Sequence, residues 1–229
     1  MSTIKYQIKC TLSTTPMKNE SRHPPRKTFH HGDLRKALLE AGIELARQGG
    51  PEAVVLREAT RRAGVAPNAA YRHFSNHRDL LAAVRAAALS SLAVAMETEM
   101  EGVPRGRPAA ERARANLRAV GTGYLKFALN EPGLLRTAFS GTESVEGNID
   151  PAYAGKTGLN PFQLLGGTLD LLVESGVLPR ERRSGAEYVA WSAVHGLAFL
   201  ILDGPLSTAS RRQIQRLSDR VLQMVETGL

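Results

Sequence analysis

The stretch from Val55 to Phe74 constrains this chain most, because two short helical patterns meet there at a single glycine. Apolar residues recur at helical spacing in the first pattern: Leu56, Ala59 and Ala63. Gly64 follows the last of them, and glycine supplies the left-handed backbone that ends a helix sharply. Pro67 suits the first turn of the next helix, where a missing N–H costs nothing. The sequence therefore predicts a helix, a tight turn and a second helix that meets the first at a steep angle.

The second of these helices, expected over residues 67–74, carries side chains that can bond to DNA. In such a unit the second helix can lie in the major groove while the first crosses the DNA backbone. The residues expected to contact DNA are Arg57, Pro67, Asn68, Ala69, Tyr71, Arg72, His73 and His77. We expect Asn68, Ala69 and Arg72 near base edges, and Tyr71 and His73 on phosphates. Taken by itself, the glycine turn does not indicate DNA binding. An ordinary corner between two helices of an all-helical protein explains it equally well.

The amino-acid sequence of a longer segment resembles that of a known protein family. The run GVAPNAAYRHFSNHRDLL, Gly64 to Leu81, is similar to the DNA-binding domain of the tetracycline-repressor (TetR) family of bacterial transcription regulators, which includes the AcrR type. With GDLRKALLEAGIEL, Gly32 to Leu45, the resemblance covers about residues 32–91. It implies an N-terminal three-helix helix-turn-helix domain, followed by a C-terminal helical domain for ligand binding and dimerisation.

Two features depart from the family pattern. Val55 and Ala66 stand where the two helices usually begin with Ser or Thr, so each helix lacks a side-chain cap worth about 1 kcal/mol. A Lys that commonly follows the aromatic pair, where it would meet a phosphate, is replaced by Asn76 and His77. These departures weaken the expected phosphate contacts at those positions.

Positive charge is concentrated in the N-terminal part of the chain. Of the formal net charge of +8, residues 1–100 carry +6 and residues 101–229 carry +2. Such a field is expected of a protein that binds a polyanion, although a solvated basic surface gives the same imbalance. Residues 1–31 are basic and lack periodicity, so we expect a flexible arm, which either touches DNA or is a disordered tail. Met17 is an alternative start.

Cysteine usage and hydropathy exclude several classes of protein. Cys10 is the only cysteine, so the chain has no disulfide framework and no multi-cysteine zinc site, and we expect neither a metal nor a cofactor. No run of eighteen apolar residues and no apolar signal-peptide core are present. We therefore expect a cytoplasmic protein that does not bind membranes.

Helical periodicity continues to the end of the chain, and no strand or internal repeat is convincing. The expected helices span residues 33–48, 55–63, 67–74, 78–101, 108–130, 132–139, 160–175, 184–202 and 207–227. The fold class is therefore all-α. We expect a basic arm at 1–31, a helix-turn-helix domain at 32–91, and a regulatory and dimerisation domain at 92–229. The helices over 184–202 and 207–227 are expected to pair with their symmetry mates in a four-helix bundle.

An aromatic set lies on helices that must converge in the C-terminal domain. Its members are Tyr124, Phe127, Phe139, Phe162, Trp191 and Phe199, with His195 as the expected polar contact. Apolar cavities with a few polar groups are the usual form of a ligand site, but any one of these rings also suits a solid core. The run WSAVHGLAFL, Trp191 to Leu200, resembles the Trp-His-Gly (WHG) class of C-terminal domains in the same family.

Catalytic chemistry has no recognisable pattern here. The spacing of Ser192, His195 and Asp203 fits no catalytic triad, and a junction near Phe74 separates His73 from His77. We therefore expect a homodimeric, ligand-responsive repressor that binds a palindromic operator in double-stranded DNA and is released by a small apolar effector. Two alternatives are an architectural DNA-binding protein without a ligand, and a helical enzyme or carrier with a vestigial N-terminal domain.

Overall fold

The computed structural model describes residues 31–141 and 150–229, and every regular element in those ranges is a helix. The α-helices are α1 (His31–Gly49), α2 (Leu56–Ala63), α3 (Pro67–Ala70), α4 (His77–Glu101), α5 (Ala109–Asn130), α6 (Pro132–Ala138), α7 (Pro161–Glu174), α8 (Ala186–Leu202) and α9 (Arg211–Gly228). Short 3-10 turns occupy Pro51–Ala53, Pro151–Tyr153 and Arg180–Arg182. The all-α fold class is confirmed. The predictions for residues 1–30, including the basic arm, Cys10 and Met17, lie outside the described residues.

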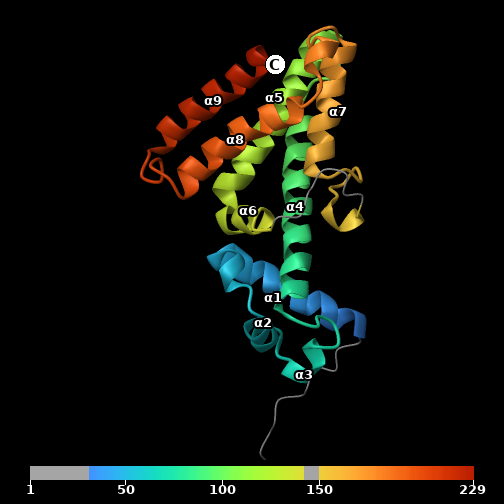
Figure 1. The fold of residues 1–229 in the computed structure, drawn as a ribbon, viewed down its shortest axis with the longest axis vertical. Coiled ribbons are helices and arrows are strands. Elements are labelled where there is room, and N and C mark those ends of the chain that lie inside the picture. The colour runs from blue at the N-terminus through green and yellow to red at the C-terminus, as the bar shows by residue number, and fades with distance from the viewer. Residues whose placement is uncertain (1–30, 142–149) are drawn as a thin grey trace, which may run out of the picture.

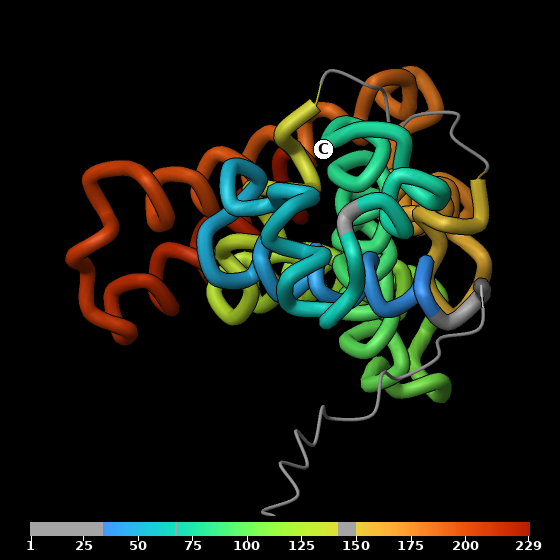
Figure 2. Tube along the Cα trace, turned by 90° about the horizontal axis from the view of Figure 1, so that it is seen from below, coloured from blue at the N-terminus to red at the C-terminus, as the bar shows by residue number. Residues whose placement is uncertain are grey.

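The helices form two groups joined by one long helix (Figure 1). We call α1, α2 and α3 the head, and α5 to α9 the body. Helix α4 begins at the head and runs into the body, where α5, α6 and α7 pack against it. Seen from below, α8 and α9 extend to one side of the molecule (Figure 2). A domain boundary at residues 91 and 92 would fall inside α4, and that boundary stays a prediction.

Helix α4 forms the centre of the core. Its buried residues include Leu80, Leu89 and Leu92, each fully enclosed. By length and apolar composition this helix could cross a membrane, but half of its most apolar window is buried inside the protein. A central core helix in a protein of this size has that property because it is covered on several sides.

The second helix of the helix-turn-helix is shorter than predicted. The sequence predicted a helix over residues 67–74, whereas α3 ends at Ala70 and the chain continues as a turn. The N–H groups of His73 and Phe74 both bond to the carbonyl of Ala70. Phe74 is 2% exposed, and the guanidinium of Arg35 lies 5.0 Å from its ring centre. Burial of this ring against α1 takes the chain off the helical path.

Helix α6 approaches the backbone of α1 closely at Gly133. A Cβ atom added to Gly133 would lie 2.2 Å from the carbonyl oxygen of Ala46 and 2.6 Å from that of Arg47. These carbonyls belong to the last turns of α1, so only glycine permits this approach. An ion pair between Arg47 Nε and Glu131 Oε2, at 2.8 Å, lies beside the contact. The body is therefore held directly against the head.

A buried carboxylate on α4 fixes the segment before α7. Glu97 is 3% exposed and accepts bonds from the N–H groups of Lys156 and Thr157, at 2.7 and 2.8 Å, and from the Thr157 hydroxyl. Burial acts to raise the pKa of Glu97, but these hydrogen bonds outweigh it and the pKa is lowered. The ionised carboxylate therefore stabilises the folded state above its ordinary pKa, and this contribution is lost as the pH falls.

The Glu97→Gln variant is expected to be about 1–3 kcal/mol less stable than the wild type at pH 7, because a charged acceptor is lost. The difference should shrink as the pH falls below the ordinary glutamate pKa. Urea unfolding at pH 7 and pH 4 measures both values. Glu99→Gln is the matched control, since Glu99 on the same helix makes only a surface ion pair with Lys126. An equal loss at both pH values would contradict the stabilising role of the charge.

Candidate functional site

The turn between α2 and α3 has the geometry that the sequence predicted. Gly64 has φ 67 and ψ 32, the left-handed conformation, and its N–H points to the carbonyls of Thr60 and Arg61. The N–H of Val65 also bonds to the Thr60 carbonyl, at 3.1 Å. Val55 precedes α2 without a side-chain cap, as predicted from its identity. The buried side chains of Leu56 and Ala59 direct the opposite face of α2 outward.

On the surface of the helix-turn-helix, two arginines are paired with an acid and two others are not. Arg61 and Arg62 both bond to Glu58, at 2.6 and 3.3 Å. The bond from Arg61, with a smaller one from Arg62, lowers the pKa of Glu58 to about 2. Arg57 and Arg72 are exposed, and neither forms an ion pair with any acid in the described ranges. Their charges are therefore available to a polyanion.

The structure places the expected DNA contacts at different depths. Arg57, Asn68, Tyr71, Arg72 and His77 are exposed, and Ala69 is half-buried. Pro67 is the first residue of α3. Tyr71 is 57% exposed, although it is a large aromatic residue. His73 is half-buried and its Nε2 atom lies inside the protein, so it is less well placed for a phosphate than Tyr71.

Asn76 has a role that the sequence analysis missed. Its side chain accepts a bond from the N–H of Asp79 at 3.0 Å, and the Asp79 carboxylate accepts one from the N–H of Ser75 at 3.0 Å. This reciprocal cap starts α4 and separates His73 from His77, as expected. The sequence pattern that could have indicated this cap is an Asn followed three residues later by an acidic residue. Within the described ranges, no group of three or more His, Cys, Asp or Glu residues is arranged to hold a metal ion.

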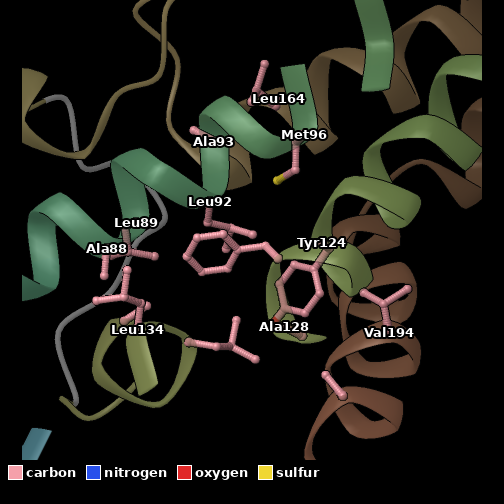
Figure 3. Packing of buried hydrophobic residues seen from close by; sticks show 14 of the residues in the cluster. Ala88, Leu89, Leu92, Ala93, Met96, Tyr124, Ala128, Leu134, Leu164 and Val194 are labelled. Atoms are coloured by element: carbon pink, nitrogen blue, oxygen red, sulfur yellow. The ribbon is translucent and has the colours of Figure 1, made fainter. Parts of the chain in front are cut away.

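A small apolar cavity lies in the body, against α4. Its volume is about 50 Å³. Its lining residues are Leu89, Met96, Leu117, Arg118, Val120, Gly121, Tyr124, Phe139, Pro161, Phe162, Leu165, Ala190, Trp191, Val194, Leu222 and Val225. Figure 3 shows three of them, Met96 of α4, Tyr124 of α5 and Val194 of α8, among the buried residues of the core. The cavity therefore touches the helix that begins at the head.

The predicted aromatic set is only partly at this cavity. Tyr124, Phe139, Phe162 and Trp191 line it, whereas Phe127, His195 and Phe199 do not. His195 lies behind the wall: its Nδ1 is 2.6 Å from the Tyr124 hydroxyl, and its ring centre is 4.8 Å from that of Phe139 and 4.6 Å from that of Phe199. Burial raises the pKa of Tyr124 and lowers the pKa of His195, so both groups are neutral at pH 7.

Arg118 is a lining residue that the sequence analysis missed. It lies on α5 beside Leu117, and its guanidinium bonds to Glu226 and Asp219 on α9, at 3.0 and 3.2 Å. Its charge sets it apart from the apolar and aromatic residues that typically indicate such a cavity. The available signal was the position of Arg118 on the same helix, three residues before Gly121, which also lines the cavity.

Two family descriptions match separate parts of the chain. Residues 38–84 match "Bacterial regulatory proteins, tetR family", and residues 117–225 match "Tetracyclin repressor-like, C-terminal domain". Together the matched segments cover more than half of the chain. The chain belongs to the TetR family. It is accordingly a DNA-binding transcription regulator and not an enzyme. The matched C-terminal description does not confirm the WHG class, which stays a prediction.

Solved structures share the fold of this TetR-family chain. A protein with unknown function from Rhodococcus sp. RHA1 is 24% identical, with 89% of this chain and 99% of that chain covered and a TM-score of 0.69. A putative tetR family transcription regulator from Shewanella sp. PV-4 is 14% identical, with 85% and 97% covered and a TM-score of 0.57. The transcriptional regulator FadR from Bacillus subtilis, in complex with stearoyl-CoA, is 17% identical, with 85% and 98% covered and a TM-score of 0.53. A comparison with curated proteins found no match.

Proposed function

We propose that this TetR-family regulator is a homodimeric repressor that binds a palindromic operator and leaves it when a small apolar effector occupies the cavity of the body. One observation carries the proposal. Leu89 and Met96, which line the cavity, belong to α4, the helix that begins at the head. An occupant that displaces α4 therefore changes the position of α2 and α3.

The effector can change DNA binding only if its own affinity differs between the two positions of the heads, before and after α4 is displaced. Couplings of about 1–3 kcal/mol change DNA affinity roughly 5- to 150-fold, and the operator weakens effector binding by the same factor. The transcriptional regulator FadR, which shares the fold, was solved in complex with stearoyl-CoA, a molecule with a long apolar chain, and this agrees with an apolar effector here. Fluorescence of Trp191, the only tryptophan, reports on occupancy of the cavity.

Exposed apolar residues on α8 and α9 support a dimer. Val189 and Leu200 on α8 are 59% and 46% exposed, and Met224 on α9 is 57% exposed. Two small exposed residues, Ser192 and Gly196, lie between the first two along the same face of α8. Such a face permits close approach of a second copy and is costly to leave in water. Two heads would then meet half-sites about 34–36 Å apart, or a multiple of that distance.

On the DNA side, the proposal assigns base contacts to Asn68, Ala69 and Arg72 and a phosphate contact to Tyr71. Arg72→Ala is expected to cost about 1–3 kcal/mol in operator affinity and to relax selectivity at one base pair. Tyr71→Phe should weaken operator and random DNA alike. Arg61→Ala is the matched control, because Glu58 already neutralises Arg61. Equal losses on operator and random DNA from Arg72→Ala would reject the base contact.

The test of the whole proposal is selection of genomic DNA fragments by the purified protein, followed by release with apolar compounds. We expect a small set of fragments that share a palindrome. We also expect compounds that quench or shift Trp191 fluorescence to release these fragments. Enrichment of fragments without a shared palindrome would contradict a dimeric repressor.

The cavity volume also favours a second candidate, a DNA-binding protein without an effector. Ligand sites usually measure about 300–1,000 Å³, far more than the volume of about 50 Å³ here. The two candidates differ in one measurement. An effector-dependent repressor loses operator affinity with at least one apolar compound, whereas an architectural protein keeps its affinity with all of them.

A further inference from the structure

Six of the twelve Phe, Tyr and Trp residues of the chain gather in one cluster beside the cavity of the body. They are Tyr124 of α5, Phe139 at the end of α6, Phe162 of α7, and Tyr188, Trp191 and Phe199 of α8. The ring centre of Trp191 lies 5.5 Å from that of Phe139 and 6.3 Å from that of Phe162. Contacts between rings therefore join α6, α7 and α8 at the cavity.

The wall of the cavity is aromatic where it is partly exposed. Apart from Arg118, each non-aromatic lining residue is buried, and so is Tyr124. Phe139, Phe162 and Trp191 line the cavity and are only half-buried. A cavity of about 50 Å³ must enlarge to take a ligand, and a half-exposed ring turns outward at lower cost than a close-packed side chain is displaced. The occupant therefore lies against these three rings.

Opening this part of the wall separates rings that attract one another. The rings of Phe139 and Trp191 are tilted by 48°, and those of Phe162 and Trp191 meet at 75°, close to edge-to-face. Such a pair is more favourable than burial of the same area alone, because the positive edge of one ring meets the negative face of the other. An alkyl chain that parts the rings does not restore this attraction, whereas an aromatic occupant forms new ring pairs in its place.

The polar groups of the wall are already paired, which favours an uncharged occupant. Arg118 bonds to Glu226 and Asp219, and no carboxylate is among the described lining residues. The Tyr124 hydroxyl lies 2.6 Å from Nδ1 of His195. Burial raises the pKa of this tyrosine and lowers the pKa of this histidine, so both are neutral at pH 7. Neither an anion nor a cation finds an unpaired opposite charge in the described wall.

We infer that the cavity takes an uncharged, planar aromatic molecule, which parts Trp191 from the rings of Phe139 and Phe162 and forms ring pairs with them. This inference rests on the effector cavity of the proposed function and names the chemical class of its occupant. A planar ring suits the small cavity because it is thinner than a saturated ring with the same number of carbon atoms. An alkyl chain is the rival occupant, since the enclosed part of the wall is largely aliphatic.

The test compares three uncharged ten-carbon alcohols: 2-naphthol, which is planar and aromatic, decahydro-2-naphthol, which is its saturated form, and 1-decanol, which is a linear chain. Calorimetry measures their binding to the full chain at pH 7. We expect 2-naphthol to bind at least roughly five-fold more tightly than either saturated alcohol, because each ring pair corresponds to about two- to ten-fold in affinity.

Phe162→Leu tests the ring contact directly. The preference for 2-naphthol over decahydro-2-naphthol should fall roughly two- to ten-fold, because leucine keeps the wall apolar but forms no ring pair. The cost of removing each alcohol from water is the same for wild type and variant, so it does not affect this comparison. Phe139→Leu should act in the same way. Binding of decahydro-2-naphthol within about two-fold of the wild type shows that a variant is folded.

Phe199→Leu is the matched control. Phe199 is also half-buried, and its ring centre lies 4.6 Å from that of His195, but it does not line the cavity. This variant should keep the preference of the wild type. A loss of preference as large as that of Phe162→Leu would overturn direct contact between the lining rings and the ligand.

The outcomes separate the inference from the proposed function. If either saturated alcohol binds the wild type as tightly as 2-naphthol does, or if both lining variants keep the preference, the aromatic class is wrong and the apolar effector cavity stands. If none of the three alcohols binds, the effector cavity and the inference both fall. If 2-naphthol binds with the expected preference but releases no operator fragment, the aromatic site stands and the effector role of the cavity falls.

Discussion

The Gly133→Val variant is expected to be about 3 kcal/mol less stable than the wild type, or more, because the new side chain has no space. Its Cβ alone would lie 2.2 Å from the carbonyl oxygen of Ala46, which belongs to the backbone of α1 and cannot turn aside. Helix α6 must therefore separate from α1. Chemical unfolding of the purified protein measures the loss.

Gly167→Val is the matched control for this substitution. Gly167 also lies within a helix, α7, but a Cβ atom added there meets nothing within 4 Å. Its stability should change by about 0.5 kcal/mol or less, since valine is not a worse helix former than glycine. Similar losses in the two variants would show that the contact between α6 and α1 does not restrict residue 133.

Charging the outer face of α8 is expected to convert the proposed dimer to a monomer. In the double variant Val189→Glu and Leu200→Glu, two glutamates from each copy would face each other across an apolar interface, which is costly without partners. Loss of the dimer should lower operator affinity roughly 100-fold or more, because the second head no longer binds as part of the same molecule. Sedimentation and DNA titration measure the two effects separately.

Leu129→Glu serves as the control, because Leu129 is 43% exposed near the end of α5, a different helix from the one that carries Val189 and Leu200. This variant should remain a dimer with the operator affinity of the wild type. If the double variant of α8 sediments as the wild type does, the dimer is formed by another surface. If the wild type is itself a monomer at micromolar concentration, the homodimer is rejected.

Local sequence signals predicted much of the helical architecture. A helix was expected from residue 160, where Asn160, Pro161 and Gln163 form a pattern typical of a capped start, and the structure has the complete capping box at α7. Gly64 predicted the left-handed end of α2. These predictions succeeded because each depends on hydrogen bonds and backbone angles within a few residues.

Predictions that depend on tertiary contacts were less accurate. The helix expected to reach Phe74 stops at Ala70, because the Phe74 ring is buried against α1, an element distant in sequence. The aromatic set was expected to converge, and most of its rings do, but the sequence could not tell lining rings from those behind them. His195 contacts three lining residues, Tyr124, Phe139 and Trp191, but does not line the cavity itself. Spacing along one helix does not determine such depth.

The small cavity has a consequence for the amount of effector to which the protein responds. A site that must open before it is filled binds with an apparent affinity reduced by the fraction of molecules that are open. Each increment of about 1.4 kcal/mol in the free energy of opening raises tenfold the concentration that half-fills the site. A wall that closes to about 50 Å³ therefore sets a threshold. Under the proposed function, trace amounts of effector leave the operator occupied, and transcription changes only after the effector has accumulated.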